Sequence, residues 1–391
     1  MSTLFCTGIS EEKDSFKAGV SVASQALKKL DSSKPHVALL FCSVIYDYAQ
    51  LIAGFKSITG EISIIGCTTS GEFTEGGVSK NGVACALIST DSYSFNMGMG
   101  LNLKENVYQT VQDAKEKFPP VDYAFPFNSA MIFVDGLAGK GEEAVLTAAE
   151  VMTEDVIFIG GAAGDNLQFK ETKVIVNNDV FSDGVGICSI NSKKPIIISV
   201  KHGHRPLSGP LIITKSVDNI VYEINGRPAL DAWKDVVRPF SPDVDSCNES
   251  ELKECLLKFQ FGIMTGGEYK VRSPFPRPHG NALNFTCSMM EGTTIKVMDS
   301  TENDQIFSAK RAAELAMAQV KNQKIAGAII FDCACRAMIL KNRFPEAIQE
   351  IRNVLKDIPL IGFESYGEIA MKAGHFSGFH NTTTAIMLIP D

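Results

Sequence analysis

The sequence lacks the features that would place it in a membrane, in an oxidising compartment or on nucleic acid. Its longest apolar stretch, Val37 to Tyr46, is too short to cross a bilayer, and Met1 to Lys13 has neither the basic start nor the apolar run of a signal peptide. Lysine and arginine are scattered and the net charge is -8, so no footprint for phosphate backbones or anionic lipids is present. Ten cysteines in a long chain without a secretion signal argue for reduced thiols, and the absence of a C-x-x-C pair leaves no zinc-ribbon or thioredoxin-like signature. We therefore expect a cytoplasmic protein that binds neither nucleic acid nor a membrane.

Complete catalytic motifs are also missing. Residues 136–141 look like a phosphate-binding loop, but the glycine spacing is too short and no serine or threonine follows Lys140. Ser70 and Ser365 do not lie in G-x-S-x-G, so a nucleophile elbow is not supported. The histidines form no H-E-x-x-H motif and no close set with cysteines at metal-ligand spacing. The sequence predicts no catalytic residue and no bound metal ion.

The length and composition are those of an ordinary globular protein. At 391 residues the chain exceeds the size at which one hydrophobic core keeps growing, which favours two domains of similar size. With 45% hydrophobic residues, either half could bury a core. Prolines, glycines and charges at 193–195 and 202–210 interrupt the apolar strands. We place the boundary there, which predicts domains at 1–204 and 205–391.

One unit of sequence recurs three times along the chain. In each copy an apolar strand, a helix and a second strand lead to a glycine-rich turn, which ends in an acidic residue and precedes another apolar strand. The outer copies share the turn G-x-x-x-x-G-E, at residues 66–72 and 362–368. The middle copy, at 160–165, is one residue shorter and ends in aspartate. The two halves are therefore expected to be assembled from one strand-helix-strand unit.

The periodicity of the unit predicts its secondary structure. Helices are expected from Asp47 to about Thr59, around Glu142 to Met152, and from Pro345 to Leu355. Strand-helix-strand order implies right-handed crossovers between parallel strands. The strand after each turn follows too soon for a crossover, so it is expected to pair antiparallel or in a mixed sheet. The predicted fold class is α/β (mixed α+β), with two domains of mixed sheets covered by helices.

The acid that ends each turn has two interpretations. A carboxylate at the rim of a sheet is suited to hold polar ligand groups, and ligands commonly dock at the ends of strands. The acid can also accept amide hydrogens within its own turn, while the glycines supply positive φ. Glu72, Asp165 and Glu368 are candidate binding residues on the first interpretation and turn residues on the second.

Arg336 and two thiols are further candidates. Arg336 follows a buried-looking strand, where it could present a planar fork of donors to a carboxylate or pair with Asp332. Cys67 and Cys335 lie at strand ends, and these are the thiols whose reactivity is worth testing first.

The histidines leave haem open as a cofactor. A neutral imidazole is a suitable axial ligand for haem iron, so all six are eligible, and the absence of C-x-x-C-H excludes covalent attachment only. His202 and His204 flank a glycine, which on a strand would put both rings on one face; the alternative is a solvated strand end.

Together these residues resemble the FIST family, bacterial sensory proteins with a FIST N-terminal and a FIST C-terminal domain in tandem. The resemblance covers nearly the whole chain. It is carried in the first half by residues 65–72, 134–137 and 159–165, and in the second by 225–230, 331–336, 362–369 and 380–383. One departure is Cys335, where the family often has glycine before the arginine.

The resemblance implies a non-enzymatic sensor that binds a small ligand, with amino acids suggested for the family and haem-based nitric oxide sensing for one branch. Signalling would then act on a separate protein, for which the haem branch suggests a histidine kinase or a cyclic-dinucleotide enzyme, and a homo-oligomer stays open. The alternatives are an enzyme in which carboxylates of two turns converge for acid-base work, and a scaffold that only binds proteins. The predicted ligand-binding residues are Cys67, Ser70, Glu72, Asp165, Arg336, Tyr366, Glu368 and Asn381, and the candidate haem ligands are His202, His204 and His380.

Overall fold

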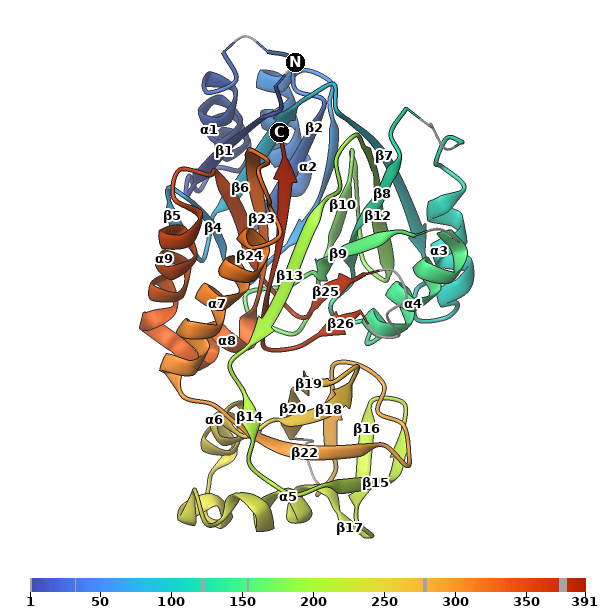
Figure 1. Cartoon of the computed structure of the whole chain (residues 1–391), viewed down its shortest axis with the longest axis vertical. Coiled ribbons are helices and arrows are strands. Elements are labelled where there is room, and N and C mark those ends of the chain that lie inside the picture. The colour runs from blue at the N-terminus through green and yellow to red at the C-terminus, as the bar shows by residue number, and fades with distance from the viewer. Residues whose placement is uncertain (1, 32, 121–123, 153–154, 277–279, 373–377) are drawn as a thin grey trace.

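Three six-stranded sheets form the body of the molecule, and each holds one copy of the repeated unit (Figure 1). The computed structural model describes residues 2–31, 33–120, 124–152, 155–276, 280–372 and 378–391. Within these residues, no helix has the length and apolar character needed to span a bilayer.

Each of these sheets combines strands from distant parts of the chain. In spatial order, the first sheet contains β1 (Leu4–Ser10), β6 (Val83–Ser89), β2 (Val37–Cys42), β3 (Ser63–Thr68), β10 (Val174–Val176) and β11 (Asp179–Phe181). The second contains β7 (Tyr93–Leu101), β12 (Gly184–Ser192), β8 (Phe127–Val134), β9 (Ile157–Ala162), β25 (Glu368–Met371) and β26 (Phe379–His380). The third contains β13 (Ile197–His202), β27 (Thr383–Pro390), β23 (Ile325–Cys333), β24 (Leu360–Ser365), β4 (Glu72–Thr74) and β5 (Gly77–Ser79).

The three copies share one topology, and it is the one predicted. The two strands joined by a helix are parallel in each copy: β2 with β3, β8 with β9, and β23 with β24. The strand after the turn is antiparallel to the first strand in each copy: β6 to β2, β12 to β8, and β27 to β23. The mixed sheets are therefore confirmed.

Each sheet is completed by a hairpin from another copy. The β4–β5 hairpin of the first copy pairs with β24, the β25–β26 hairpin of the third copy pairs with β9, and the β10–β11 hairpin of the second copy pairs with β3. The exchange closes a cycle of three. Strands from both sides of the expected boundary at 204/205 share sheets, and the division of the chain into domains there stays a prediction.

The core explains why the strands read as continuous apolar runs. In β2, Leu39 and Phe41 point into the core shared by the three sheets, whereas Ala38, Leu40 and Cys42 point toward the helices. Because both faces are buried, both sets are apolar. Phe41, Phe133 and Phe331 lie near the ends of the first strands of the three copies and pack together with Phe363, with the closest ring centroids 4.6 Å apart.

Helices cover the outer face of each sheet. The first sheet is covered by α1 (Ser15–Lys28) and α2 (Tyr48–Thr59), the second by α3 (Val107–Lys115) and α4 (Gly141–Met152), and the third by α7 (Glu302–Met317) and α9 (Phe344–Leu355). The predicted helices start where expected to within one residue. Asp47 accepts the Gln50 N–H as the cap of α2, and Pro345 lies in the first turn of α9. Between β23 and α9 lie α8 (Ala334–Leu340) and the 3-10 turn η2 (Lys341–Arg343).

A second, smaller domain lies between β13 and α7 in the chain (Figure 1). Its strands in spatial order are β19 (Glu268–Arg272), β18 (Phe261–Thr265), β22 (Thr294–Asp299), β15 (Leu211–Val217), β16 (Ile220–Ile224), β21 (Leu283–Phe285) and β20 (Pro274–Pro276), with β14 (Arg205–Pro206) on β22 and β17 (Arg227–Pro228) on β16. Its helices are α5 (Ala229–Val237), η1 (Pro242–Asp245) and α6 (Glu249–Lys258). Two connections, β13 to β14 and β22 to α7, join it to the body. We call residues 205–299 the small domain.

The first glycine of each repeated turn is required by close approach of two strands. A Cβ on Gly66 would lie 1.8 Å from Leu40 O, and one on Gly160 would lie 1.9 Å from Ile132 O. Gly66 does not have a positive φ. The expectation that the turn glycines supply positive φ is therefore wrong at Gly66, where contact with the neighbouring strand leaves no room for a side chain.

Candidate functional site

The three turns meet one another and are joined by main-chain hydrogen bonds. The bonds run from Gly164 N–H to Thr68 O (2.8 Å), from Ser70 N–H to Glu364 O (3.0 Å), and from Tyr366 N–H to Ala162 O (3.1 Å). The first, second and third turns are thus each bonded to the other two. The cyclic exchange of hairpins brings them together, because each hairpin follows directly from a turn or from the loop after it.

Glu72 and Glu368 are each held inside their own turn. Thr69 Oγ1 donates to Glu72 Oε1, and Gly82 N–H donates to Oε2 at 3.2 Å. Ser365 Oγ donates to Glu368 Oε1 in the same way, at 2.5 Å. Both carboxyls are fully buried, and burial raises the pKa of each well above the ordinary value. These contacts are those of the turn interpretation.

Asp165 organises the loop that follows the middle turn. Its Oδ1 accepts the Phe169 N–H at 2.9 Å, and its Oδ2 accepts the N–H groups of Lys170 and Glu171 at 2.6 and 3.0 Å. Tyr366 Oη of the third turn donates to Oδ1 as well. The loop holds Phe169 at φ 52°, a region that bulky residues rarely adopt. Asp165 thus places the Phe169 and Tyr366 rings in a stack, with centroids 5.0 Å apart.

Arg336 and Cys67 are occupied within the body. Arg336 is fully buried, and its Nε donates to Asp332 Oδ1 at 2.8 Å. Its Nη1 donates to Gln305 Oε1 at 2.7 Å and to Ser308 Oγ at 2.8 Å, which matches the expected alternative of a structural pair. Cys67 lies in the core shared by the three sheets, and burial raises the pKa of its thiol well above the ordinary value.

A cavity of about 400 Å³ lies between the body and the small domain. Its apolar lining comes from both sides, with Leu137, Leu167, Phe169, Met338 and Tyr366 from the body and Leu257, Pro274, Phe275, Pro276 and Phe285 from the small domain. The volume and the mainly apolar, aromatic lining are typical of small-molecule sites, which often lie between domains. We call this cavity the interdomain pocket.

Of the predicted ligand-binding residues, Tyr366 lines the interdomain pocket. Three others, Asp165, Ser70 and Asn381, do not line it but contact residues that do. Asp165 holds the Tyr366 hydroxyl, and Ser70 Oγ lies beside that hydroxyl without a hydrogen bond of ordinary geometry. Asn381 Oδ1 accepts a 3.0 Å hydrogen bond from Thr286 Oγ1, and Thr286 lines the pocket. Glu72, Glu368, Arg336 and Cys67 do not line it, whereas Cys335, the other candidate thiol, does.

The three candidate haem ligands do not fit a haem at this pocket. His202 Nε2 lies 2.8 Å from Tyr269 O, His204 has Ser300 Oγ and Gln305 Nε2 each at 3.2 Å, and His380 Nε2 lies 3.0 Å from Ala370 O. Burial lowers the pKa of all three, that of His204 to about 3. An axial ligand needs a free nitrogen facing a cavity, and none of the three lines the pocket. His36 is engaged with Thr90 N–H, and His279 and His375 lie outside the described residues.

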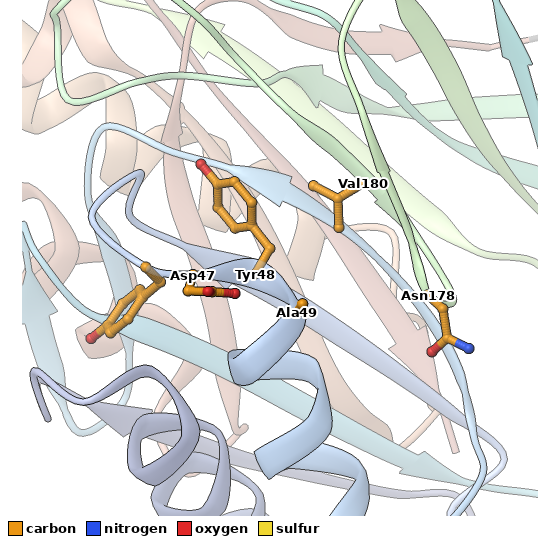
Figure 2. Close-up of a pocket in the computed structure, with 6 residues that line it drawn as sticks. Asp47, Tyr48, Ala49, Asn178 and Val180 are labelled. Atoms are coloured by element: carbon orange, nitrogen blue, oxygen red, sulfur yellow. The ribbon is translucent and has the colours of Figure 1, made fainter.

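A second hollow, of about 490 Å³, is open to solvent at the start of α2 (Figure 2). Figure 2 shows Asp47, Tyr48 and Ala49 across from Asn178 and Val180 of the β10–β11 hairpin. The Asp47 carboxylate already serves as the cap of α2, and the Asp47 main-chain N–H donates to Ser15 Oγ at 3.0 Å. Since these polar groups serve the fold, we do not assign this hollow as the site.

Several residues of the pocket were not predicted from the sequence. Phe169, Phe275 and Phe285 supply its aromatic lining, and Asn284 places an amide there. One signal was present, because Pro274-Phe275-Pro276 puts an aromatic residue between two prolines, which often marks an edge strand. The others carried no local signal, since they become neighbours only when the small domain packs against the body.

Comparisons with known proteins agree with the repeated motifs. A family model described as FIST N domain matches residues 36–227, and one described as FIST C domain matches residues 229–371. An uncharacterized protein of Mycobacterium tuberculosis strain H37Rv is 23% identical over 98% of this chain and 99% of its own length. An uncharacterized protein of Methanocaldococcus jannaschii is 21% identical over 94% of this chain and 76% of its own length.

Among solved structures, two cyanuric acid hydrolases are similar at a low level. One aligns with 7% identity and a TM-score of 0.33 over 100% of both chains. The other, from A. caulinodans, aligns with 8% identity and a TM-score of 0.35 over 98% of this chain and 99% of its own. These scores are too low to bear on function. The two family models, in contrast, span most of the sequence in tandem, and the chain belongs to the FIST family, whose domains are generally sensory domains for small ligands.

Proposed function

We propose that this protein is a non-enzymatic sensor whose small, flat ligand binds in the interdomain pocket. The observation that carries the proposal is the lining of the pocket, to which the body and the small domain both contribute. A ligand there contacts both parts at once. Two chain connections and side-chain contacts such as the Arg272–Glu142 ion pair (3.1 Å) join them. Differential affinity for two arrangements of these contacts would convert binding into a change of shape.

The chemistry of the lining supports an apolar or aromatic ligand. Phe169, Phe275, Phe285 and Tyr366 supply flat apolar surface, and Lys253 is the one charged residue among the described lining residues. A free amino acid carries two opposite charges, and a carboxylate to meet its ammonium group is not part of this lining. We therefore favour an aromatic ligand over an amino acid.

The enzyme alternative has less support. Acid-base work by two turns would need Glu72 and Glu368 to face one substrate. Each is instead fully buried and bonded inside its own turn, and neither lines the pocket. Haem is not part of the proposal, because the described histidines do not fit it. A separate signalling partner remains a prediction from the family resemblance.

Filling the pocket is expected to weaken ligand binding. Met338 lies on α8 and lines the pocket, so Met338→Trp would put an indole into space that a ligand needs. The probe is anilinonaphthalene sulfonate, whose fluorescence rises in apolar sites. We expect its affinity to fall about tenfold or more in the variant.

The hollow of Figure 2 provides the matched control. Ala49 is exposed there, so Ala49→Trp adds the same side chain at the other concavity and is expected to leave the titration unchanged. Equal probe affinity in Met338→Trp and the unmodified protein, with both folded by circular dichroism, would sink the proposal.

A further inference from the structure

Asn284 stands apart from the other polar residues of the interdomain pocket because no described residue bonds its side chain. It lies in β21 between Leu283 and Phe285 and lines the pocket. Its Oδ1 is buried without a hydrogen bond, and no described residue accepts from its Nδ2. The neighbouring Asn219 is different, because its Nδ2 donates to Phe285 O at 2.7 Å and so serves the fold.

A buried amide oxygen without a partner costs free energy, so it needs a reason. A carboxamide presents an acceptor oxygen and donor hydrogens in one plane. The edge that satisfies both at once has a donor and an acceptor side by side, as an adenine edge does when asparagine reads it. A single N–H donor or a methyl-rich ligand would satisfy at most half of it.

The same pocket offers a face for a flat ring. Phe169 and Tyr366 lie parallel to within 15°, and Phe275 meets Phe169 edge-on with centroids 6.3 Å apart. Aromatic side chains stack on planar heterocycles whatever the identity of the heterocycle, so stacking supplies affinity. Selectivity between heterocycles then comes from hydrogen bonds to the edge of the ring.

We propose that Asn284 selects the ligand of this pocket, and that the ligand is a planar nitrogen heterocycle with a hydrogen-bond donor and acceptor on adjacent positions of one edge. The inference rests on the proposed function, because it assigns a chemical class to the ligand of the same site. The stack of Phe169 and Tyr366 holds the ring, and the Asn284 amide, whose Oδ1 is covered in this structure, turns to pair with its edge.

Calorimetry with adenine tests the class directly. The two comparison ligands are a 1,7-dideaza analogue, which lacks both ring acceptors beside the amino group, and an N6,N6-dimethyl analogue, which lacks the exocyclic donor. All three ligands carry a methyl group at N9, which removes the donor beside N3. We expect adenine to bind and each analogue to bind at least about tenfold more weakly, since a bidentate amide contact discriminates by that factor or more. In Asn284→Ala the three ligands should bind equally. Asn353→Ala, an exposed asparagine on α9, is the control and should behave as the unmodified protein.

The two proposals fail in distinguishable ways. If anilinonaphthalene sulfonate binds Met338→Trp weakly and circular dichroism shows that Asn284→Ala is folded, the pocket is a binding site and the Asn284 variant is a valid test of it. Adenine that then fails to bind, or binds as well as both analogues, overturns the role of Asn284 alone. If Met338→Trp binds anilinonaphthalene sulfonate with the affinity of the unmodified protein, the proposed function itself is overturned.

Discussion

Replacing Gly66 by alanine is expected to cost about 3 kcal/mol of folding stability or more, which is the upper range for overpacking a core. Gly66 lies on β3 opposite Leu40 of β2 in a parallel pair of strands. This pair lies inside the sheet, with β6 bonded to β2 and β10 bonded to β3. The added Cβ would lie 1.8 Å from Leu40 O and 2.7 Å from Leu40 C. Those atoms are backbone in the middle of a sheet, so rotating a side chain cannot relieve the contact, and the two strands must separate.

Chemical denaturation of Gly66→Ala is the measurement, with Gly209→Ala as the matched control. In the described part of the chain, no atom other than those of its two chain neighbours lies within 4 Å of a Cβ at Gly209. Its φ is not positive either, so the control should change stability little. Gly160→Ala should repeat the loss, because its Cβ would lie 1.9 Å from Ile132 O in the second copy of the unit. Two glycine variants as stable as the Gly209→Ala control would show that the strands can move apart at little cost.

Glu364→Gln is expected to make the protein more stable at pH 8 and to change it little near pH 4.5. Glu364 is 1% exposed, and its Oε1 has no hydrogen-bond partner among the described residues. Burial raises the pKa of its carboxyl from 4.5 to about 8, while Lys80 opposes the shift and Asp332 adds to it. In the unfolded chain the carboxyl ionises near pH 4.5, whereas in the folded protein it keeps its proton until about pH 8.

The sign of the effect follows from proton counts. Between pH 4.5 and about 8 the folded state binds more protons at this residue than the unfolded state, so stability falls as pH rises through that window. Glutamine has a similar shape and cannot ionise. The gain of Glu364→Gln over the unmodified protein should therefore grow across the window, to on the order of 4 kcal/mol at pH 8.

Denaturation at pH 5 and pH 8 measures this difference, with the exposed Glu105→Gln as the control for loss of one carboxylate. Glu72 and Glu368 are also buried with raised pKa values, so the difference between variant and unmodified protein, rather than the pH dependence of the latter, isolates Glu364. A stability gain that is the same at both pH values would mean that Glu364 is ionised in the folded protein.

The interdomain pocket illustrates where local patterns stop being informative. Phe169, Phe275 and Tyr366 come from the loop after the middle turn, the small domain and the third turn, and they meet in one cavity. Tyr366 could be singled out because it lies in a repeated motif. Phe169 could not, because its position depends on Asp165, whose carboxylate folds the loop back on itself.

The roles of the acidic residues in the turns could not be predicted from local sequence either. Their presence and spacing are visible in the sequence, but their role depends on which donors reach them. Glu72 accepts a hydrogen bond from Gly82 N–H, and Glu368 accepts one from Thr383 Oγ1. Both donors lie where the strand after the hairpin begins. Because these bonds occupy the carboxylates, the two acids serve the turns and not a ligand.

The sequence by itself determined the repeated unit, its helices and its strands, because apolar periodicity, helix caps and turn residues act over a few neighbouring positions. The β2 strand at Val37–Cys42 and the α2 cap at Asp47 are examples. Only the tertiary structure decided which copies exchange hairpins, that residues 205–299 form a separate sheet, and which side chains line the pocket. Those outcomes depend on pairings such as Glu72 with Phe363, between strands far apart in the chain, where shape and buried hydrogen bonds choose the partner.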